Sequence, residues 1–433
     1  MKILIIGKIT GLVLLSIALT GCGGGGGTGD ATASSVATSN WMSDPITGLP
    51  RQDITVYTQS NIAPADNVLP ITVGRTNKFL VSLTVCVPGS NLCQTVDKIM
   101  VDTGSVGLRI HASVLPVLQG QLPLQGQSGK VIAQCATFGN FYTWGSLRAA
   151  DVGFGAHKAS ALPVQVYDDP ALPAVSSTGC GTQIGGLIDA DPAAVQFNGV
   201  LGIRGTRLDE LGTFYSCQTS GKTCSTTVLT DKELLPNPII NLPQDNNGYQ
   251  IVMPSIPIDG SSQVTGALVL GLNTQSNNNL SQTGTSASNM LALDSKQRVA
   301  LYIDGVSYGA LIDSGTSVNT LSTTNVPTCG ASAPLAYCSS PITMQPIQLA
   351  AAVKPTIVLV ASLYIGNWLN LLATNLPAIG TLTAKTPSTV VANGVQSILG
   401  APFFYGKRIS FGITGQTVQT NNTQVTNSFV AFN

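Results

Sequence analysis

The sequence predicts an all-β protein with minor helices, and three observations support this class. Only 9% of the 433 residues are charged, and uncharged polar residues take their place, as suits short strands and polar turns. Apolar and β-branched runs of strand length recur between turn signals, at residues 79–85, 98–101, 266–270 and 299–303. Helical patterns are few and short, at residues 192–196 and 230–235, which is too little for the crossover helices of a parallel sheet.

Length and charge bound the organisation of the chain and its partners. With 43% hydrophobic residues, the chain can form a large core, and we expect two lobes, at residues 66–235 and 236–433. Lys and Arg together number 20, and so do Asp and Glu. Because no basic excess is present to neutralise a phosphate backbone, the sequence predicts no nucleic-acid partner. We also expect a monomer.

The N-terminus has the pattern of an export signal. Lys2 and Lys8 precede an apolar run, residues 9–19, that is too short to span a bilayer. The four residues that end at Cys22, LTGC, resemble the bacterial lipobox, which implies that Cys22 receives a lipid and becomes the mature N-terminus. Residues 1–22 are therefore predicted to be a lipoprotein signal peptide and lipobox. An ordinary signal peptide with an incidental cysteine is the alternative.

Residues 23–65 are predicted to be a flexible tether. They are rich in Gly, Ser, Thr, Ala and Asn and show little hydrophobic periodicity. Gly23 rather than Asp follows Cys22, which resembles the signal for outer-membrane sorting. We therefore expect a cell-envelope lipoprotein of the outer membrane that faces the periplasm or the exterior and is attached to the membrane by its lipid.

Eight cysteines remain beside Cys22, an even number that fits disulfides formed in an oxidising compartment. Three pairs are close in sequence and the last two cysteines would pair by elimination, among about 105 possible connectivities. The candidate pairs are Cys86–Cys93, Cys217–Cys224, Cys329–Cys338 and Cys135–Cys180. A zinc site is the competing interpretation, but no Cys-x-x-Cys cluster occurs and His111 and His157 are the only histidines, so we expect no metal.

One acidic design occurs twice: apolar strand residues are followed by Asp, a hydroxyl residue, Gly and a second hydroxyl residue. The two copies are Asp102-Thr103-Gly104-Ser105 and Asp313-Ser314-Gly315-Thr316. A single copy would fit an ordinary turn, in which Asp caps backbone N–H groups and Gly adopts a positive φ. Two copies, each directly after an apolar strand, favour a pair of carboxylates held rigidly at two strand ends.

Such a pair can carry out acid–base chemistry. Two carboxylates about 3 Å apart cannot both ionise cheaply, so they share one proton. One of Asp102 and Asp313 could then act as base and draw a proton from a water held between them. The water attacks a peptide carbonyl, and the protonated partner donates a hydrogen bond to the developing oxyanion. This chemistry hydrolyses a polypeptide substrate and needs no cofactor.

These motifs resemble the pepsin-like aspartic peptidases, in which each of two lobes donates an Asp loop to the cleft between them. In that family a later hydrophobic-hydrophobic-Gly segment supports each loop, and residues 198–203 and 397–400 are similar to these segments. The order of loop, support, loop and support covers nearly all of the predicted folded part. The resemblance implies a bilobed double barrel and aspartic endopeptidase activity, with Asp102 and Asp313 as the catalytic residues.

The resemblance also implies roles for the other loop residues. Ser105 and Thr316 would donate to the outer carboxylate oxygens, which lowers the pKa values of the pair and predicts an acidic optimum. Thr103 and Ser314 would link the two loops across the pair. Gly104 and Gly315 complete the two loops.

Tyr142 is the candidate for a flap residue. The family closes its cleft with a β-hairpin that bears a tyrosine, and the Tyr-x-x-Gly-Ser pattern that begins at Tyr142 is similar to that hairpin. A half-buried strand aromatic is the alternative, and Phe138, Phe141 or Trp144 could instead reach the cleft.

The sequence departs from the family after both motifs. Val106 and Arg109 stand where the family has Ser and Trp, and Ala401 follows the second support segment where the family has Asp. A catalytically silent, surface-anchored protein that binds peptides or glycans is therefore the alternative function. A serine hydrolase is disfavoured, because only His111 or His157 could be its base, and we expect both to be structural.

Overall fold

The structure is a computed structural model that describes residues 43–54, 56–57, 62–127, 129–139, 141–173, 180, 188–210, 212–218, 223–280, 290–331, 333–386, 396–420 and 423–432. The chain divides into two compact units, Met1–Asn40 and Trp41–Asn433. All described residues belong to the second unit. The predicted signal peptide, Cys22 and the first part of the predicted tether lie outside the described residues.

Strands dominate the described part of the chain. The strands of its first half are β1 (Arg51–Asp53), β2 (Val68–Gly74), β3 (Lys78–Cys86), β4 (Cys93–Asp102), β5 (Val106–His111), β6 (Gly126–Gln127), β7 (Lys130–Thr137), β8 (Phe141–Phe154), β9 (His157–Tyr167), β10 (Ile188–Asp189), β11 (Gly199–Ile203), β12 (Thr213–Gln218) and β13 (Cys224–Thr227).

The second half continues in the same manner. Its strands are β14 (Gly248–Met253), β15 (Thr265–Leu270), β16 (Met290–Ala292), β17 (Val299–Ile303), β18 (Val306–Ile312), β19 (Asn319–Leu321), β20 (Cys338–Ala350), β21 (Val358–Asn367), β22 (Thr383–Lys385), β23 (Ser397–Leu399), β24 (Lys407–Gly412), β25 (Val418–Gln419), β26 (Gln424–Val425) and β27 (Phe429–Phe432). The helices of the described residues are α1 (Pro192–Val195), α2 (Trp368–Ala373) and α4 (Ala401–Phe404), with 3₁₀ turns η1 (Ala112–Val114), η3 (Pro238–Asn241) and η4 (Ser276–Asn278).

The predicted all-β class with minor helices is confirmed. The four predicted runs lie in β3, β4, β15 and β17, and the first predicted helix is α1. Asp191 caps α1, because its carboxylate accepts from the amides of Ala193 and Ala194. The helix predicted at residues 230–235 is wrong: this segment is a turn closed by Glu233, whose carboxylate accepts from the Thr230 amide at 2.9 Å and hydroxyl at 2.8 Å. Pro236 follows directly and disfavours a helical residue before it.

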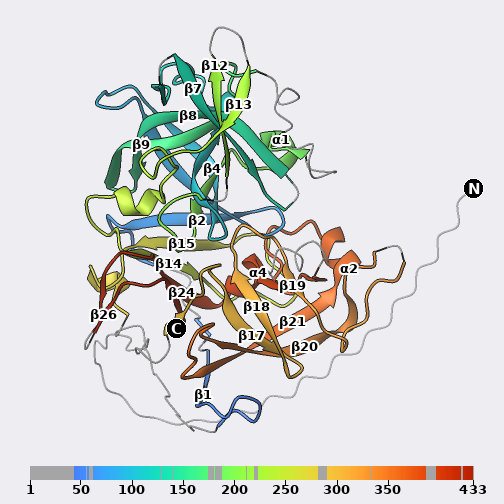
Figure 1. The fold of residues 1–433 in the computed structure, drawn as a ribbon. Helices are drawn as coiled ribbons and strands as arrows, with labels where there is room; N and C mark the ends of the chain where they lie inside the picture. The colour runs from blue at the N-terminus through green and yellow to red at the C-terminus, as the bar shows by residue number, and fades with distance from the viewer. Residues whose placement is uncertain are drawn as a thin grey trace, which may run out of the picture. The chain divides into compact units, whose positions relative to one another are not determined.

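Two large sheets carry the motifs identified in the sequence. In an eight-stranded sheet, the order is β1-β21-β20-β17-β18-β23-β19-β22, and a 17-stranded sheet holds most remaining strands of the described part. The larger sheet crosses the predicted boundary after residue 235, because β15 pairs with β2 and β14 pairs with β15 and β24. Figure 1 shows β2, β14, β15 and β24 between the group that holds β7, β8, β9 and β12 and the group that holds β17 to β21.

Part of the predicted tether is folded. β1 pairs in parallel with β21, with Arg51 opposite Val358 and Asp53 opposite Val360. Asp44 accepts a hydrogen bond from the Gln348 side chain at 2.6 Å. The prediction of a flexible tether through residue 65 is therefore wrong for Arg51–Asp53, because the free edge of β21 offers backbone hydrogen bonds that do not require an apolar strand.

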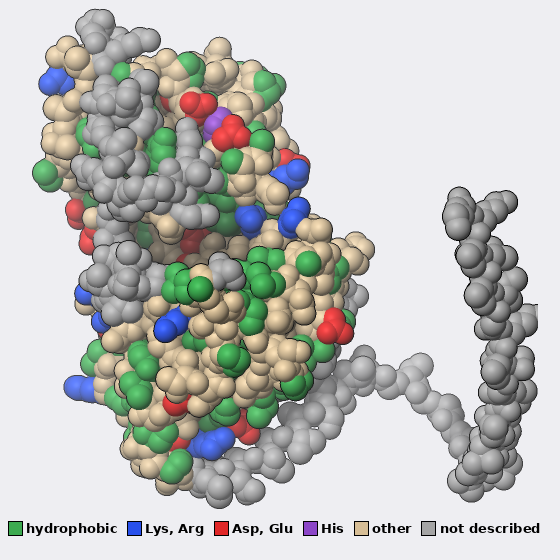
Figure 2. Space-filling view, turned by 90° about the vertical axis from the view of Figure 1, so that its right-hand side faces the viewer, with side chains coloured by type: hydrophobic (Ala, Val, Ile, Leu, Met, Phe, Trp, Pro, Cys, Tyr) green, Lys and Arg blue, Asp and Glu red, His purple; other side chains and the backbone are tan. Residues whose placement is uncertain are grey.

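The largest hydrophobic cluster contains residues of both sheets, such as Ile71 and Leu108 from the larger sheet and Leu301 and Ile347 from the smaller one, all fully buried. Its continuity through the second unit holds the strands that carry the two motifs in fixed positions. Charged side chains are few and scattered on the face shown in Figure 2, as the composition requires.

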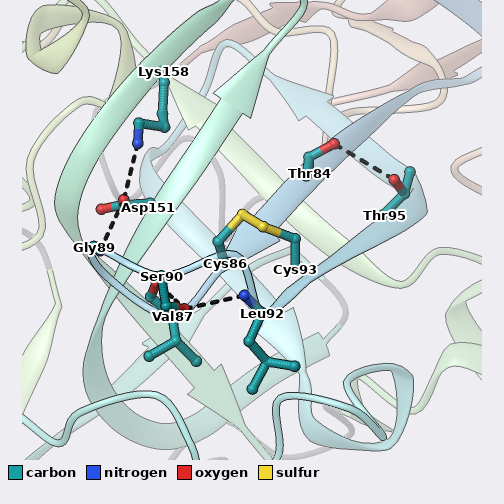
Figure 3. Close-up of a disulfide and its surroundings, with 10 residues drawn as sticks. All are labelled: Thr84, Cys86, Val87, Gly89, Ser90, Leu92, Cys93, Thr95, Asp151 and Lys158. Carbon is teal, nitrogen blue, oxygen red and sulfur yellow. Dashed lines mark hydrogen bonds and ion pairs between the residues drawn. A yellow bond between two sulfur atoms is a disulfide. The ribbon is translucent and has the colours of Figure 1, made fainter.

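Four disulfides form within the described residues, and they are the four pairs predicted from the sequence. They join Cys86 to Cys93, Cys135 to Cys180, Cys217 to Cys224 and Cys329 to Cys338. The first closes the hairpin between β3 and β4, beside a turn whose Gly89 amide donates to Asp151 (Figure 3). Disulfides at this density are typical of extracellular or envelope proteins. None of the helices in the described ranges has the length and apolar character needed to cross a bilayer.

Candidate active site

Equivalent strand arrangements hold the two Asp loops. β4 ends at Asp102, and β11 pairs with it in parallel so that Gly202 lies opposite Asp102, while β11 also pairs antiparallel with β5. Asp313 follows β18 directly, β23 pairs in parallel with β18, and the Asp313 amide donates to the Leu399 carbonyl at 2.9 Å. The two predicted support segments are therefore confirmed as the strands beside the two loops.

Two hydroxyl side chains cross-link the loops. The Thr103 hydroxyl donates to the Ile312 carbonyl at 2.7 Å and accepts from the Ser314 amide at 3.0 Å. In the same way, the Ser314 hydroxyl donates to the Val101 carbonyl at 2.7 Å and accepts from the Thr103 amide at 3.2 Å. Both side chains are buried. The four hydrogen bonds have two-fold symmetry, and they tie the ends of β4 and β18 together.

Each carboxylate accepts hydrogen bonds from its own loop. The Asp102 carboxylate accepts from the Gly104 amide at 2.8 Å and the Ser105 hydroxyl at 2.5 Å. The second carboxylate accepts from the Gly315 amide at 2.8 Å and the Thr316 hydroxyl at 2.7 Å. These donors fix the orientation of each carboxylate.

The two glycines let the carboxylates approach each other. A Cβ atom on Gly104 would lie 2.7 Å from Cγ of Asp313, and one on Gly315 would lie 2.5 Å from Oδ1 of Asp102. Both distances are too short for a side chain, so only glycine fits at these positions. The carboxyl groups of Asp102 and Asp313 therefore lie close together, each against the glycine of the other loop. The structure thus brings together all eight predicted residues of the two loops.

Electrostatics favours one proton on the pair. Burial raises the pKa of the Asp313 carboxyl, and the charge of Asp102 adds to this effect, so that the pKa reaches about 7. Hydrogen bonds from Thr316 and Gly315 act in the opposite direction and are outweighed. Hydroxyl donation therefore lowers the pKa of Asp313 as expected, but the expectation of a lowered pKa overall is wrong for this residue. A carboxyl that stays protonated near neutral pH can serve as an acid there.

Arg204 is a further charged residue near the pair, and the sequence analysis missed it. Its amide donates to the Ser105 carbonyl at 2.8 Å. Burial lowers the pKa of the Arg204 guanidinium, and the negative charges of Asp313 and Asp102 oppose that change. Arg204 therefore interacts electrostatically with both carboxylates. Its place two residues after Gly202, at the end of a support segment, is the signal that could have indicated it.

Tyr142 lies at the start of β8, next to the turn of the β7–β8 hairpin, where it pairs with Thr137. It packs beside a cluster that includes Cys135 and Trp144. Phe138 at the turn packs with a different cluster, which contains Met100 of β4. The structure therefore provides a hairpin at the predicted position, and the flap role of Tyr142 stays a prediction.

Other contacts occupy the positions where the sequence departs from the family pattern. Arg109 is buried and forms an ion pair with Asp209. Ala401 begins α4, and its amide donates to the Thr316 carbonyl at 2.8 Å. Both residues therefore contribute to the surroundings of the Asp loops.

Both histidines have structural partners. His111 Nδ1 accepts from the Ser113 amide at 3.0 Å, and His157 Nε2 lies 2.9 Å from a carboxylate oxygen of Asp245. A Gly-x-Ser-x-Gly pattern, which in serine hydrolases carries the nucleophile, occurs at residues 305–309, but Ser307 lies on β18, in the β17–β18 hairpin. This is not the strand-to-helix turn of a serine hydrolase nucleophile.

Comparisons with known proteins identify a family and find a similar solved structure. A family model described as "Protein of unknown function (DUF3443)" matches residues 63–432. No curated protein matches the sequence. Among solved structures, the chain is similar to the crystal structure of an aspartic proteinase from Irpex lacteus, with a TM-score of 0.49 and 13% sequence identity. The alignment covers 84% of this chain and 96% of that chain.

Proposed function

The chain belongs to the DUF3443 family, whose description assigns no activity, and we propose from its site that it is an aspartic endopeptidase. One observation carries the proposal: the Asp102 and Asp313 carboxylates lie close together, each against the glycine of the other loop, at the centre of a two-fold symmetric set of loop contacts. Two ordinary turns would not bring two carboxylates so close together, because placing two like charges side by side in a buried site costs free energy.

The proposed reaction uses one proton on the pair. We assign that proton to Asp313, because the pKa of this residue is raised to about 7, and Asp102 acts as the base. A water held between the carboxylates loses a proton to Asp102 and attacks the carbonyl carbon of a peptide bond. The Asp313 proton stabilises the oxyanion that forms, and the pair then delivers a proton to the leaving amine as the C–N bond breaks. The products are a carboxylic acid and an amine.

We further propose that the protein acts as a monomer on polypeptides outside the cytoplasm, as a lipoprotein anchored through Cys22. The disulfides support an oxidising compartment, and the signal-like N-terminus with its LTGC sequence supports lipidation. Labelling cells with a radioactive fatty acid should label the wild type and not Cys22→Ala. Label retained in Cys22→Ala would contradict the anchor and leave the peptidase proposal unaffected.

Cleavage of an unfolded protein substrate tests the activity. Wild-type protein should release peptides at mildly acidic pH, and Asp102→Asn and Asp313→Asn should each abolish the release while keeping a wild-type circular dichroism spectrum. A pepstatin-type inhibitor should block the same cleavage. Folded wild-type protein that cleaves nothing would contradict the proposal and would favour the silent protein that binds peptides or glycans.

A further inference from the structure

A buried polar network begins at the backbone that leaves the first Asp loop. Its centre is Arg109 on β5, which is 1% exposed. The Arg109 guanidinium donates to the carbonyl oxygens of Val106 at 2.8 Å and Gly107 at 3.3 Å. Gly107 lies opposite Gly202, which in turn lies opposite Asp102. The guanidinium therefore binds the backbone of Gly107, which lies in line with Asp102 across β5, β11 and β4.

Nη2 of the Arg109 guanidinium points toward the β7–β8 hairpin. It forms an ion pair with Asp209 at 2.5 Å and lies 3.5 Å from Oε1 of Gln134 on β7. Gln134 Nε2 also donates to Asp209, at 2.6 Å. Gln134 is completely buried. Asp209 thus joins the arginine of β5 to a side chain of the hairpin.

Two further buried side chains extend the network to the second hairpin strand. Gln165 on β9 lies opposite Arg109 in the sheet. Its side-chain Nε2 donates to the backbone carbonyl of Gln134 at 2.8 Å. The Thr143 hydroxyl on β8 donates to Oε1 of Gln165 at 2.8 Å. Both hairpin strands belong to the same sheet as the first Asp loop, and these side chains add direct links from β7 and β8 to β9.

The hairpin turn contacts the same guanidinium. Arg109 Cζ lies 5.6 Å from the centroid of the Phe138 ring, within the range of a cation–π interaction. Phe138 is half-buried and stacks on Phe141, with ring centroids 4.4 Å apart. One arginine therefore contacts the exit of the Asp loop, the middle of β7 and the turn of the hairpin.

Such a network favours a single hairpin position. Each buried polar group has a large desolvation cost unless its partner stays in place. Because the members are shared among β5, β7, β8 and β9, a shift of the hairpin would break several hydrogen bonds together. Apolar packing alone would tolerate small displacements at a lower cost.

We propose that Arg109 is a positioning residue that fixes the β7–β8 hairpin relative to the Asp102 loop and so aligns a bound peptide with the carboxylates. This inference rests on the proposed peptidase function. Arg109 itself does not contact the reacting atoms; it acts through the backbone of Val106 and Gly107 and through Gln134.

Hydrogen exchange of the purified full chain tests the proposal independently of activity. Arg109→Gln and Gln134→Met should raise exchange of the amides at residues 130–139 about tenfold or more, because a hydrogen bond to a charged group contributes roughly that factor to local closing. Phe138→Leu at the half-exposed turn should give a smaller rise. The matched control is Arg408→Met, which removes another buried arginine of this sheet, on β24, whose guanidinium donates to the Gln250 side chain at 2.9 Å, and should leave these amides unchanged.

Kinetics provides the second readout. The network variants should raise KM for a peptide more than they lower kcat, and Arg109→Lys should recover part of the loss because a single ammonium can keep some of the contacts. Wild-type exchange at residues 130–139 in the network variants, or the same rise in Arg408→Met, would overturn the inference. If Arg109→Gln does not fold, Gln134→Met and Phe138→Leu decide the result. A wild type without peptidase activity would refute the proposed function, while exchange would still decide whether Arg109 fixes the hairpin.

Discussion

Asp313 should make the folded protein less stable as pH rises from acidic to neutral values. The pKa of its carboxyl is raised from 3.8 to about 7 in the fold, by burial first and by the charge of Asp102 second. Between these two values the folded chain keeps a proton that the unfolded chain has lost, so the free energy of unfolding falls as pH rises. A shift of about 3 pKa units at ~1.36 kcal/mol each corresponds to roughly 4 kcal/mol.

Asp313→Asn cannot ionise and should lack this loss. In urea unfolding without reducing agent, the variant should match the wild type near pH 4 and exceed its free energy of unfolding near pH 8, by at most about 4 kcal/mol. Asp294→Asn is a matched control of opposite sign. Burial raises the pKa of Asp294, but hydrogen bonds and charge from Arg298 outweigh burial and leave the pKa lowered. Asp294→Asn should therefore have a lower free energy of unfolding than the wild type near pH 8. An equal difference between wild type and Asp313→Asn at both pH values would refute the reasoning.

Three further outcomes are expected from the same geometry. Thr103→Ala removes one donor and one acceptor of the cross-link between the loops and should lower the free energy of unfolding by roughly 2 kcal/mol in urea; a change within error would show that the cross-link contributes no stability. Gly104→Ala places a Cβ 2.7 Å from Cγ of Asp313 and should reduce the cleavage rate about a hundredfold, so a rate near that of the wild type would contradict the close approach of the carboxylates. Replacing Cys135 and Cys180 by Ser opens a loop of 45 residues and should lower the free energy of unfolding measured by calorimetry by about 4 kcal/mol. Opening either seven-residue loop, Cys86–Cys93 or Cys217–Cys224, should lower it by about 2 kcal/mol. Equal losses would contradict the idea that a disulfide stabilises by reducing the entropy of the unfolded chain.

Local signals in the sequence were sufficient for much of the fold. Short apolar runs such as residues 79–85 and 299–303 became β3 and β17 because strands of this length bury a face without long-range information. The duplicated Asp motif predicted two loops on equivalent strands, since Asp, hydroxyl and Gly residues in this order make the same turn wherever they follow a strand. Cysteines seven or nine residues apart paired across their own hairpins or turns.

Contacts between distant segments could not be predicted in the same way. Arg109 and Asp209 are 100 residues apart in the chain, and nothing in the sequence around either one indicates the other. β1 has the polar sequence Arg-Gln-Asp, and only the free edge of β21 makes it a strand. The pKa of Asp313 depends on burial that no local pattern reports, so the hydroxyl donors seen in the sequence indicated the wrong direction.

The dependence of the cleavage rate on pH tests the central claim most directly, because the proposed mechanism requires one shared proton on Asp102 and Asp313. Initial rates on one fluorogenic peptide would be measured from about pH 3 to about pH 9. The account predicts activity that persists to near-neutral pH and is lost as pH rises through a midpoint of about 7, the value to which the pKa of Asp313 is raised. A rate that is unchanged or rises across this range would contradict the shared proton and, with it, the proposed role of the pair.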